Sequence, residues 1–304
     1  MSNRYVRIIV LFLLVATLFS LTLSKFKSSY PIIHTAKQNS PTAKSIKRAY
    51  MFYVTSKPYA CSVMVMAERL EMFKKDPAID IVALVNGIDN SQLSKMHKMG
   101  IKTKPVNKLQ ALGSSNEAEK EVWKNSNTKF QIFKDWGYDK FVYLDADTLL
   151  MDNIDHLFDL PDVPTFWVPR AYWLPEVYQP VFSTLLIVGK PSQKIYDAAV
   201  SYSKVDNGIY DMDVLNKLYK HKVGVLPNIY GLINRSFYQG FPEEYMLDGA
   251  VFEEDFKLIH ITDYATHQYG KPWDYPQNKP EDKTAYPYFY QTLETFNKHY
   301  DKYC

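Results

Sequence analysis

The alternation of strand-like and helix-like segments along residues 49–144 constrains the fold more than any other feature of the chain. Runs of apolar, aromatic and β-branched residues predict buried strands at 49–55, 79–85, 101–106 and 141–144. Apolar residues at helical spacing predict helices at 59–74, 91–99 and 120–136. Strands that alternate with helices form mostly parallel sheets with helices on both faces. We therefore expect an α/β domain of this kind.

The remainder of the chain is less regular but continues the same domain. Further strands are predicted at 165–169, 184–188, 223–226 and 257–261, and helices at 192–203 and 212–219. We find no internal repeat and no break in composition after residue 48. Residues 49–304 are therefore expected to form one domain.

An acidic turn, Asp145-Ala146-Asp147, directly follows the apolar strand at 141–144. Ligands of parallel sheets bind at the carboxyl ends of the strands, so this turn is the place to look for a site. Both carboxylates can point at one cation while Ala146 faces away, and Mg²⁺ and Mn²⁺ prefer such oxygen ligands. The alternative is a solvated acidic turn. Two charges beside a buried strand end favour the cation, because burial is costly without compensation.

Composition narrows the function further. The chain has 304 residues and only 11 glycines, which argues against glycine-rich phosphate loops and favours a carboxylate-and-metal way of holding phosphate. Two cysteines exclude a four-thiolate zinc site. A formal charge of +3 argues against a dedicated nucleic-acid binder.

The N-terminal region has the pattern of a membrane anchor. An uncharged apolar run at 8–24 follows Arg4 and Arg7 and precedes Lys25, which predicts a cytoplasmic tail at 1–7 and a signal-anchor transmembrane helix at 8–24. A cleaved signal peptide is the alternative, although no small-residue cleavage site follows. The short span favours the Golgi membrane over the plasma membrane, with the endoplasmic reticulum as the other option.

This orientation makes the chain a single-pass type II membrane protein. The polar residues 25–48 then form a stem, and residues 49–304 form a lumenal domain. Asn234-Arg235-Ser236 is a glycosylation sequon, which agrees with a lumenal position. Cys61 and Cys304 could pair in an oxidising lumen, and the sequence leaves that open.

The acidic turn belongs to a longer motif. Residues 141–149 (FVYLDADTL) and 153–158 (NIDHLF) resemble the signature of glycogenin-like glycosyltransferases, family 8. The resemblance covers most of residues 49–275. It implies the GT-A fold, with a Rossmann-like, mostly parallel sheet, and a retaining enzyme that uses a UDP-sugar donor and Mn²⁺, with Mg²⁺ as the alternative. The pattern is most similar to fungal and plant Golgi members, including N-acetylglucosaminyl- and α-galactosyltransferases.

The resemblance also implies roles for single residues. Metal ligands would be Asp145, Asp147 and His260, the last from the motif Ile259-His260; His267 is a weaker candidate because it lies off the predicted strand. Donor-binding residues would be Thr55, Tyr59, Lys129, Asp145, Ala146, Asp147 and Lys271, the last in Lys271-Pro272-Trp273. Catalytic residues would be Lys271, which stabilises the diphosphate, and Asp211, which orients the sugar.

Two departures from the family pattern leave the transferred sugar open among GlcNAc, Gal and Glc. The family's N-x-G corresponds to Phe182-Ser183-Thr184, and its D-Q pair corresponds to Asp211-Met212. The expected acceptor is a glycan, with mannose-containing glycans as candidates, so the expected process is protein glycosylation. The aromatic segments 170–182 and 234–245 are either an acceptor platform or ordinary loop packing.

Two other classes of function compete with this hypothesis. One is a catalytically inactive, Golgi-anchored GT-A scaffold, because a fold alone never proves activity. The intact set of Asp145, Asp147, His260 and Lys271 argues against it. The other is a metal-dependent phosphoester hydrolase, which also uses paired aspartates but does not explain the Lys271-Pro272-Trp273 motif.

Overall fold

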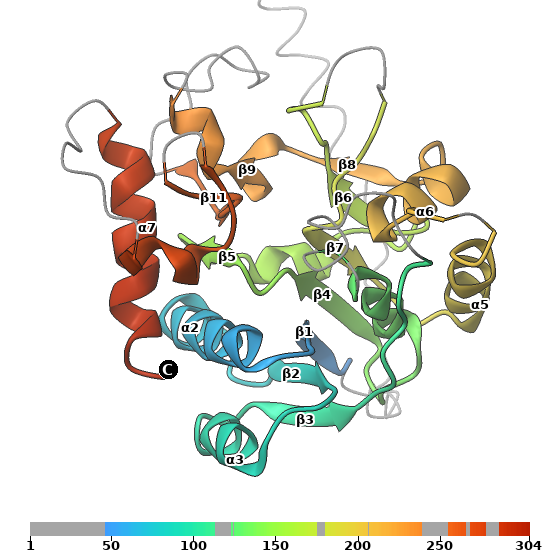
Figure 1. The fold of residues 1–304 in the computed structure, drawn as a ribbon. Coiled ribbons are helices and arrows are strands. Elements are labelled where there is room, and N and C mark those ends of the chain that lie inside the picture. Colours follow the sequence, from blue (N-terminus) through green and yellow to red (C-terminus); the bar gives the residue numbers. More distant parts are fainter. Residues whose placement is uncertain are drawn as a thin grey trace, which may run out of the picture. The chain divides into compact units, whose positions relative to one another are not determined.

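The computed structural model describes residues 46–112, 123, 125–174, 180–205, 207–238, 255–265, 268–277 and 286–304 (Figure 1). The predicted tail at 1–7, the predicted anchor at 8–24 and nearly all of the predicted stem lie outside these ranges. Within them, we find no helix that is both long enough and apolar enough to cross a membrane. Ile46–Cys304 forms one compact unit.

A seven-stranded sheet forms the centre of this unit, in the order β3-β2-β1-β4-β7-β6-β8. Its strands are β1 (Arg48–Val54), β2 (Asp80–Val85), β3 (Lys102–Pro105), β4 (Lys140–Leu144), β6 (Trp167–Pro169), β7 (Leu186–Gly189) and β8 (Gly224–Leu226). All run in one direction except β7, which is antiparallel to both β4 and β6. The predicted mostly parallel sheet is confirmed.

Helices cover both faces of this sheet, as predicted. On one face, Tyr50 and Phe52 of β1 pack with α2 (Lys57–Phe73) and α3 (Asn90–Lys98). On the other face, Ala49 and Met51 pack with residues of three elements. These are the 3₁₀ helix η1 (Ser126–Phe133), α5 (Gln193–Tyr202) and α6 (Asp211–Tyr219). Successive side chains of β1 therefore point to opposite faces of the sheet and pack in two separate hydrophobic cores.

A second, three-stranded sheet was predicted only in part. It has the order β5-β10-β9, with β5 (Thr148–Leu150), β10 (Leu258–His260) and β9 (Leu232–Ile233). Only β10 corresponds to a predicted strand, because β5 and β9 are too short to show a pattern. The antiparallel pairing of β5 with β10 places His260 opposite Thr148. This register places His260 beside the acidic turn, which directly precedes Thr148.

The C-terminal helix α7 (Pro287–Tyr300) was not predicted, although its buried residues Phe289, Leu293 and Phe296 recur at helical spacing. It lies beside α2 (Figure 1). The remaining elements are short: η2 (Asp155–Asp159), η4 (Asn228–Tyr230), η5 (Asn234–Tyr238), β11 (Asp263–Ala265), β12 (Gln268–Tyr269) and η8 (Pro272–Gln277).

The helix predicted at 120–136 requires a correction. Trp123 is helical as predicted, but residues 126–133 form the 3₁₀ helix η1 rather than an α-helix, and residues 113–122 and 124 lie outside the described ranges. The polar residues Ser126, Asn127 and Thr128 open η1, and such residues compete with helical backbone hydrogen bonds.

A disulfide joins Cys61 of α2 to Cys304, which follows α7. Their Cα atoms are 5.8 Å apart, and 243 residues separate them in the sequence. The pairing that the sequence left open is therefore present, and it fastens the end of the chain to the first helix of the domain.

Candidate active site

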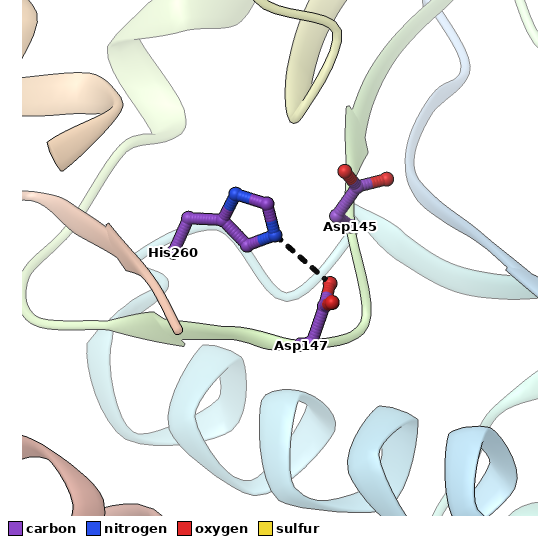
Figure 2. A group of neighbouring side chains, drawn as sticks. All are labelled: Asp145, Asp147 and His260. Carbon is purple, nitrogen blue, oxygen red and sulfur yellow. Dashed lines mark ion pairs between the residues drawn. The ribbon is translucent and has the colours of Figure 1, made fainter. Parts of the chain in front are cut away.

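Two aspartates and a histidine meet beyond the carboxyl end of β4. One potential ligand atom from each of Asp145, Asp147 and His260 lies within 4.8 Å of the others. Figure 2 shows His260 reaching from β10 toward Asp147, with its Nε2 atom 3.4 Å from Oδ1. The three predicted metal ligands are thus brought together.

Backbone pairing holds these residues in place. The Asp145 amide donates to the carbonyl of Leu185 at 2.8 Å, and the Thr148 hydroxyl donates to the Asp145 carbonyl at 2.6 Å. The Ile261 amide donates to the Asp147 carbonyl at 2.9 Å. The turn after β4 is therefore tied to the residues that precede β7 and follow β10.

Asp147 is a buried carboxylate with two cationic or potentially cationic neighbours. Lys271 Nζ lies 2.5 Å from its Oδ2 atom, and His260 approaches its other oxygen. Burial alone would raise the pKa of Asp147, but attraction to Lys271 and His260 outweighs burial and lowers it far below its usual value. Burial would lower the pKa of Lys271, but Asp147 outweighs it and raises that pKa well above its usual value. Both groups are therefore charged over the ordinary pH range.

Lys129 forms a second ionic cluster with Asp145 and Asp211. Its Nζ atom lies 3.0 Å from Asp145 Oδ1 and 2.6 Å from Asp211 Oδ2, and it also donates to the carbonyl and hydroxyl oxygens of Thr184 at 3.1 Å. Burial would lower the pKa of Lys129, but the two carboxylates raise it. Burial would raise the pKa of Asp211, but Lys129 and Thr184 lower it. Tyr143 donates a further hydrogen bond to Asp145.

These groups line a cavity of about 350 Å³. Its lining includes the predicted residues Tyr59, Lys129, Asp145, Ala146, Asp147, Asp211, His260 and Lys271. Thr55, predicted to bind the donor, is buried but does not line the cavity. Ala146 lines the cavity together with the aspartates.

Other lining residues were not predicted as site residues. They are Tyr53, Trp123, Ser126, Trp173, Leu185, Tyr210, Asp213, Thr262 and Tyr269, together with Ser183, Thr184 and Met212 at the departures from the family pattern. Isolated aromatic residues between strands and helices give only a weak sequence signal of a binding site. Of these lining residues, Trp173 could have been singled out, because it lies in the aromatic segment 170–182. His267, weighed against His260, lies outside the described ranges, as do 175–179 and 239–245 of the two aromatic segments.

The three potential metal ligands, Asp145, Asp147 and His260, suit a hard divalent cation. Two carboxylates and an imidazole nitrogen are ligands that Mn²⁺ accepts readily and Mg²⁺ accepts in part. Within the described residues, the buried Nδ1 atom of His260 and the buried hydroxyl of Tyr210 have no hydrogen-bond partner.

Comparisons with known proteins agree with this geometry. Residues 50–168 match the family model described as glycosyl transferase family 8. The chain is 28% identical over 247 residues to Glucose N-acetyltransferase 1 of Gibberella zeae, covering 74% of this chain and 53% of that protein. It is 29% identical over 254 residues to the Aspergillus fumigatus protein of the same name, covering 74% and 64%. The chain thus spans between half and two thirds of these relatives.

Solved structures show the same fold. The galactosyltransferase LgtC, crystallised as an active-site mutant, matches with a TM-score of 0.60 at 17% identity, covering 83% of this chain and 95% of that chain. This likeness confirms the mixed α/β, GT-A-like fold. Residues 50–168 match the model of glycosyltransferase family 8, so the resemblance predicted from the sequence motifs is confirmed for that segment.

Proposed function

We propose that this protein is a retaining hexosyltransferase that moves a hexosyl unit from a UDP-sugar to a glycan acceptor. The observation that carries the proposal is the group of Asp145, Asp147 and His260, which shares one cavity with two lysines: Lys271 is paired with Asp147, and Lys129 is paired with Asp145. A site with two aspartates, one histidine and two lysines suits a metal-bound diphosphate. Among the described residues, no second metal-binding group of the kind that a phosphoester hydrolase would need accompanies it.

Electrostatic stabilisation of the leaving group is the main catalytic contribution expected from this site. Mn²⁺, with Mg²⁺ as the alternative, would supply charge neutralisation of the diphosphate when bound by Asp145, Asp147 and His260. Lys271 is already charged and lies at the same carboxylate, so its ammonium would bind the phosphate oxygens on which negative charge grows. Such preorganised charge is worth most where water is excluded.

Asp211 is suited to orient the sugar rather than to attack it. Its Oδ2 atom accepts from Lys129 at 2.6 Å and from the Thr184 hydroxyl at 2.5 Å. An oxygen engaged by two donors is a poor nucleophile but a well-fixed acceptor and a fixed negative charge near a developing sugar cation. The acceptor hydroxyl would then attack from the leaving-group side, which gives retention of configuration.

The identity of the sugar and the location of the protein form part of the proposal. The fungal relatives are named for glucose and an N-acetyl group, so we place UDP-GlcNAc first among the donors, ahead of UDP-Gal and UDP-Glc. The acceptor is a glycan, with mannose-containing glycans tested first. The Cys61–Cys304 disulfide supports a lumenal, oxidising location such as the Golgi, with residues 8–24 as the anchor.

The test compares aspartate variants in a UDP-sugar transfer assay. Asp145→Asn with Asp147→Asn should abolish metal-dependent transfer, by at least about 10²–10³ in rate. Because that change leaves Lys271 without its carboxylate partner and Lys129 with Asp211 alone, His260→Gln serves as a second variant that removes one potential ligand and no negative charge. Asp162→Asn, at an exposed ion pair with Lys190, is the matched control.

Circular dichroism must show that each variant stays folded. Full turnover in a folded double variant would reject the site. Failure of the wild-type protein to bind UDP with Mn²⁺ would favour the inactive scaffold instead, and release of free sugar with every acceptor would favour a hydrolase.

A further inference from the structure

The segment that carries Lys271 is held from the outside by the C-terminal helix. Asn297 of α7 is buried, and its Nδ2 atom donates to the carbonyl of Pro272 at 2.9 Å and to that of Leu293, one turn earlier in its own helix, at 2.9 Å. The bond to Pro272 fixes the peptide group between Pro272 and Trp273, one residue after Lys271. It crosses 25 residues of sequence and joins two separate elements.

An aromatic stack restrains the next residue. The ring of Trp273 meets Tyr59 edge-on, with centroids 5.1 Å apart and planes at 74°, and stacks on Tyr300 of α7 at 6.2 Å and 20°. Tyr59 in turn lies under the Lys271 ammonium, 5.8 Å from the ring centroid. The aromatic residues thus connect α7, through Trp273, to the wall of the cavity.

Two hydrogen bonds within residues 271–274 also hold the segment that carries Lys271. The Lys271 amide donates to Asp274 Oδ2 at 3.1 Å, and the Asp274 amide donates to the Lys271 carbonyl at 3.0 Å. A lysine side chain is long and flexible, so its ammonium stays at Asp147 only if its backbone is fixed. The contacts around Lys271 supply that fixation.

Helix α7 itself is firmly anchored to the strands that bear the metal ligands. Phe289, Leu293 and Phe296 are buried in one cluster with Leu149 of β5 and Ile259 of β10. Leu149 lies two residues after Asp147, and Ile259 directly precedes His260. The same helix therefore supports the strands that carry the ligands and the segment that carries Lys271.

We propose that Asn297 and Tyr300 are positioning residues that hold Lys271 at Asp147 for the transfer reaction. The inference rests on the proposed function, because Lys271 acts there on the leaving diphosphate. Neither residue lines the cavity, so each acts only through Pro272 or Trp273. Misplacement of a reacting group by about 1 Å from remote changes can cost on the order of 10²-fold in rate.

The variants are Asn297→Leu and Tyr300→Leu, with Thr292→Val as the matched control. Leucine removes the donor to Pro272 and also removes Oδ1 of Asn297, which has no partner among the described residues. Thr292 is equally buried on α7, but its hydroxyl donates only within the helix, to the Tyr288 carbonyl at 2.8 Å. The control therefore perturbs α7 without touching the Lys271 segment.

Two readouts are needed. Hydrogen exchange should be faster in a peptide covering 268–277 for Asn297→Leu and Tyr300→Leu than for wild type and Thr292→Val, with the Gly270 and Asp274 amides as reporters because both are hydrogen-bonded. In the transfer assay with Mn²⁺, kcat should fall about tenfold or more for these two variants, while the KM for the UDP-sugar changes less than about threefold.

Unchanged exchange at 268–277, or equal loss of kcat in Thr292→Val, would overturn the proposal. A loss of activity that only follows the folded fraction, measured by thermal unfolding, would overturn it too. If the wild-type protein transfers no sugar, the proposed function fails, and the exchange data alone still decide whether α7 fixes the Lys271 segment.

Discussion

The lysine at position 129 shows how one residue can serve the stability and the chemistry of a site at once. Its ammonium is almost completely buried between two carboxylates, and each of the three groups would be costly to bury alone. The cluster also contacts Asp145, a potential metal ligand. A neutral replacement therefore has consequences for both folding and metal binding.

Replacing Lys129 with methionine should lower the free energy of unfolding by about 3–5 kcal/mol, because the buried Asp211 and the partly buried Asp145 are left without their cation. Adding Asp211→Asn should recover part of that loss, since it removes one of the two unpaired charges. Urea unfolding of the two single variants and the double variant measures the coupling. Strictly additive losses would mean that Lys129 and Asp211 do not act as a pair.

At the same scale, the sequon illustrates what sequence reasoning misses. The Asn234 side chain is fully buried, donates to the Asp263 carbonyl at 2.7 Å and accepts from the Thr262 amide at 2.9 Å. A side chain engaged in this way has no room for a glycan in the folded domain. The sequon therefore gives no support to a lumenal location, which stays a proposal.

The site residues that could be predicted are those that belong to linear motifs. Asp145, Asp147, His260 and Lys271 were predicted, and the structure brings all four together. Thr184 and Tyr143, which fix Lys129 and Asp145, were not, because a hydroxyl acquires its role only from the partners that tertiary folding brings to it.

At the scale of elements, the pairing of β5 with β10 and the docking of α7 on α2 determine the site. Both are contacts between segments that lie far apart in the sequence, so no local pattern predicts either pairing. Where the C-terminal end of α7 meets α2, Glu68 of α2 forms a small polar cluster with residues from the end of the chain. Glu68 accepts from Lys302, His299 and Tyr303 at 2.7–2.9 Å.

This cluster predicts a pH-dependent attachment of the C-terminus. Burial would raise the pKa of Glu68, but hydrogen bonds from Lys302, His299 and Tyr303 outweigh it and lower the pKa from 4.5 to about 2. Because the folded state holds the proton less tightly than the unfolded state, the cluster stabilises the fold fully above pH 4.5 and loses that contribution as pH falls toward 2. Glu68→Gln should therefore cost about 1 kcal/mol at pH 6 and progressively less toward pH 2.

Thermal unfolding of wild type and Glu68→Gln between pH 2 and pH 6 measures this difference. The two melting temperatures should converge at the acid end. A constant difference across the range would show that Glu68 contributes through its shape and packing rather than its charge. Asp162→Asn, at an exposed ion pair, controls for the loss of a surface charge.

At the scale of the whole molecule, the large sheet was predictable because its strands are buried and separated by helices, which leaves clear periodicity. Strands β5 and β9 of the second sheet and helix α7 were not predicted, because strands of two or three residues show no period and because aromatic residues are common in both helices and strands. These unpredicted parts pair with the strand that carries His260 and contact the segment that carries Lys271, so the fold class was easier to derive than the completed site.

The disulfide gives the prediction that concerns the whole domain. Cys61 and Cys304 close a loop of 243 residues, and a cross-link over so long a loop removes much of the entropy of the unfolded chain. Cys61→Ala with Cys304→Ala should therefore lower the free energy of unfolding by roughly 2–5 kcal/mol. At about 2–4 °C per kcal/mol for a domain of this size, the melting temperature should fall on the order of 10 °C.

Dithiothreitol should lower the melting temperature of the wild-type protein to a similar extent and leave that of the double variant unchanged, which makes the double variant its own control. Two thiols that react with a labelling reagent in the unfolded protein before any reduction, or equal melting temperatures with and without dithiothreitol, would show that the bond is absent from the protein in solution.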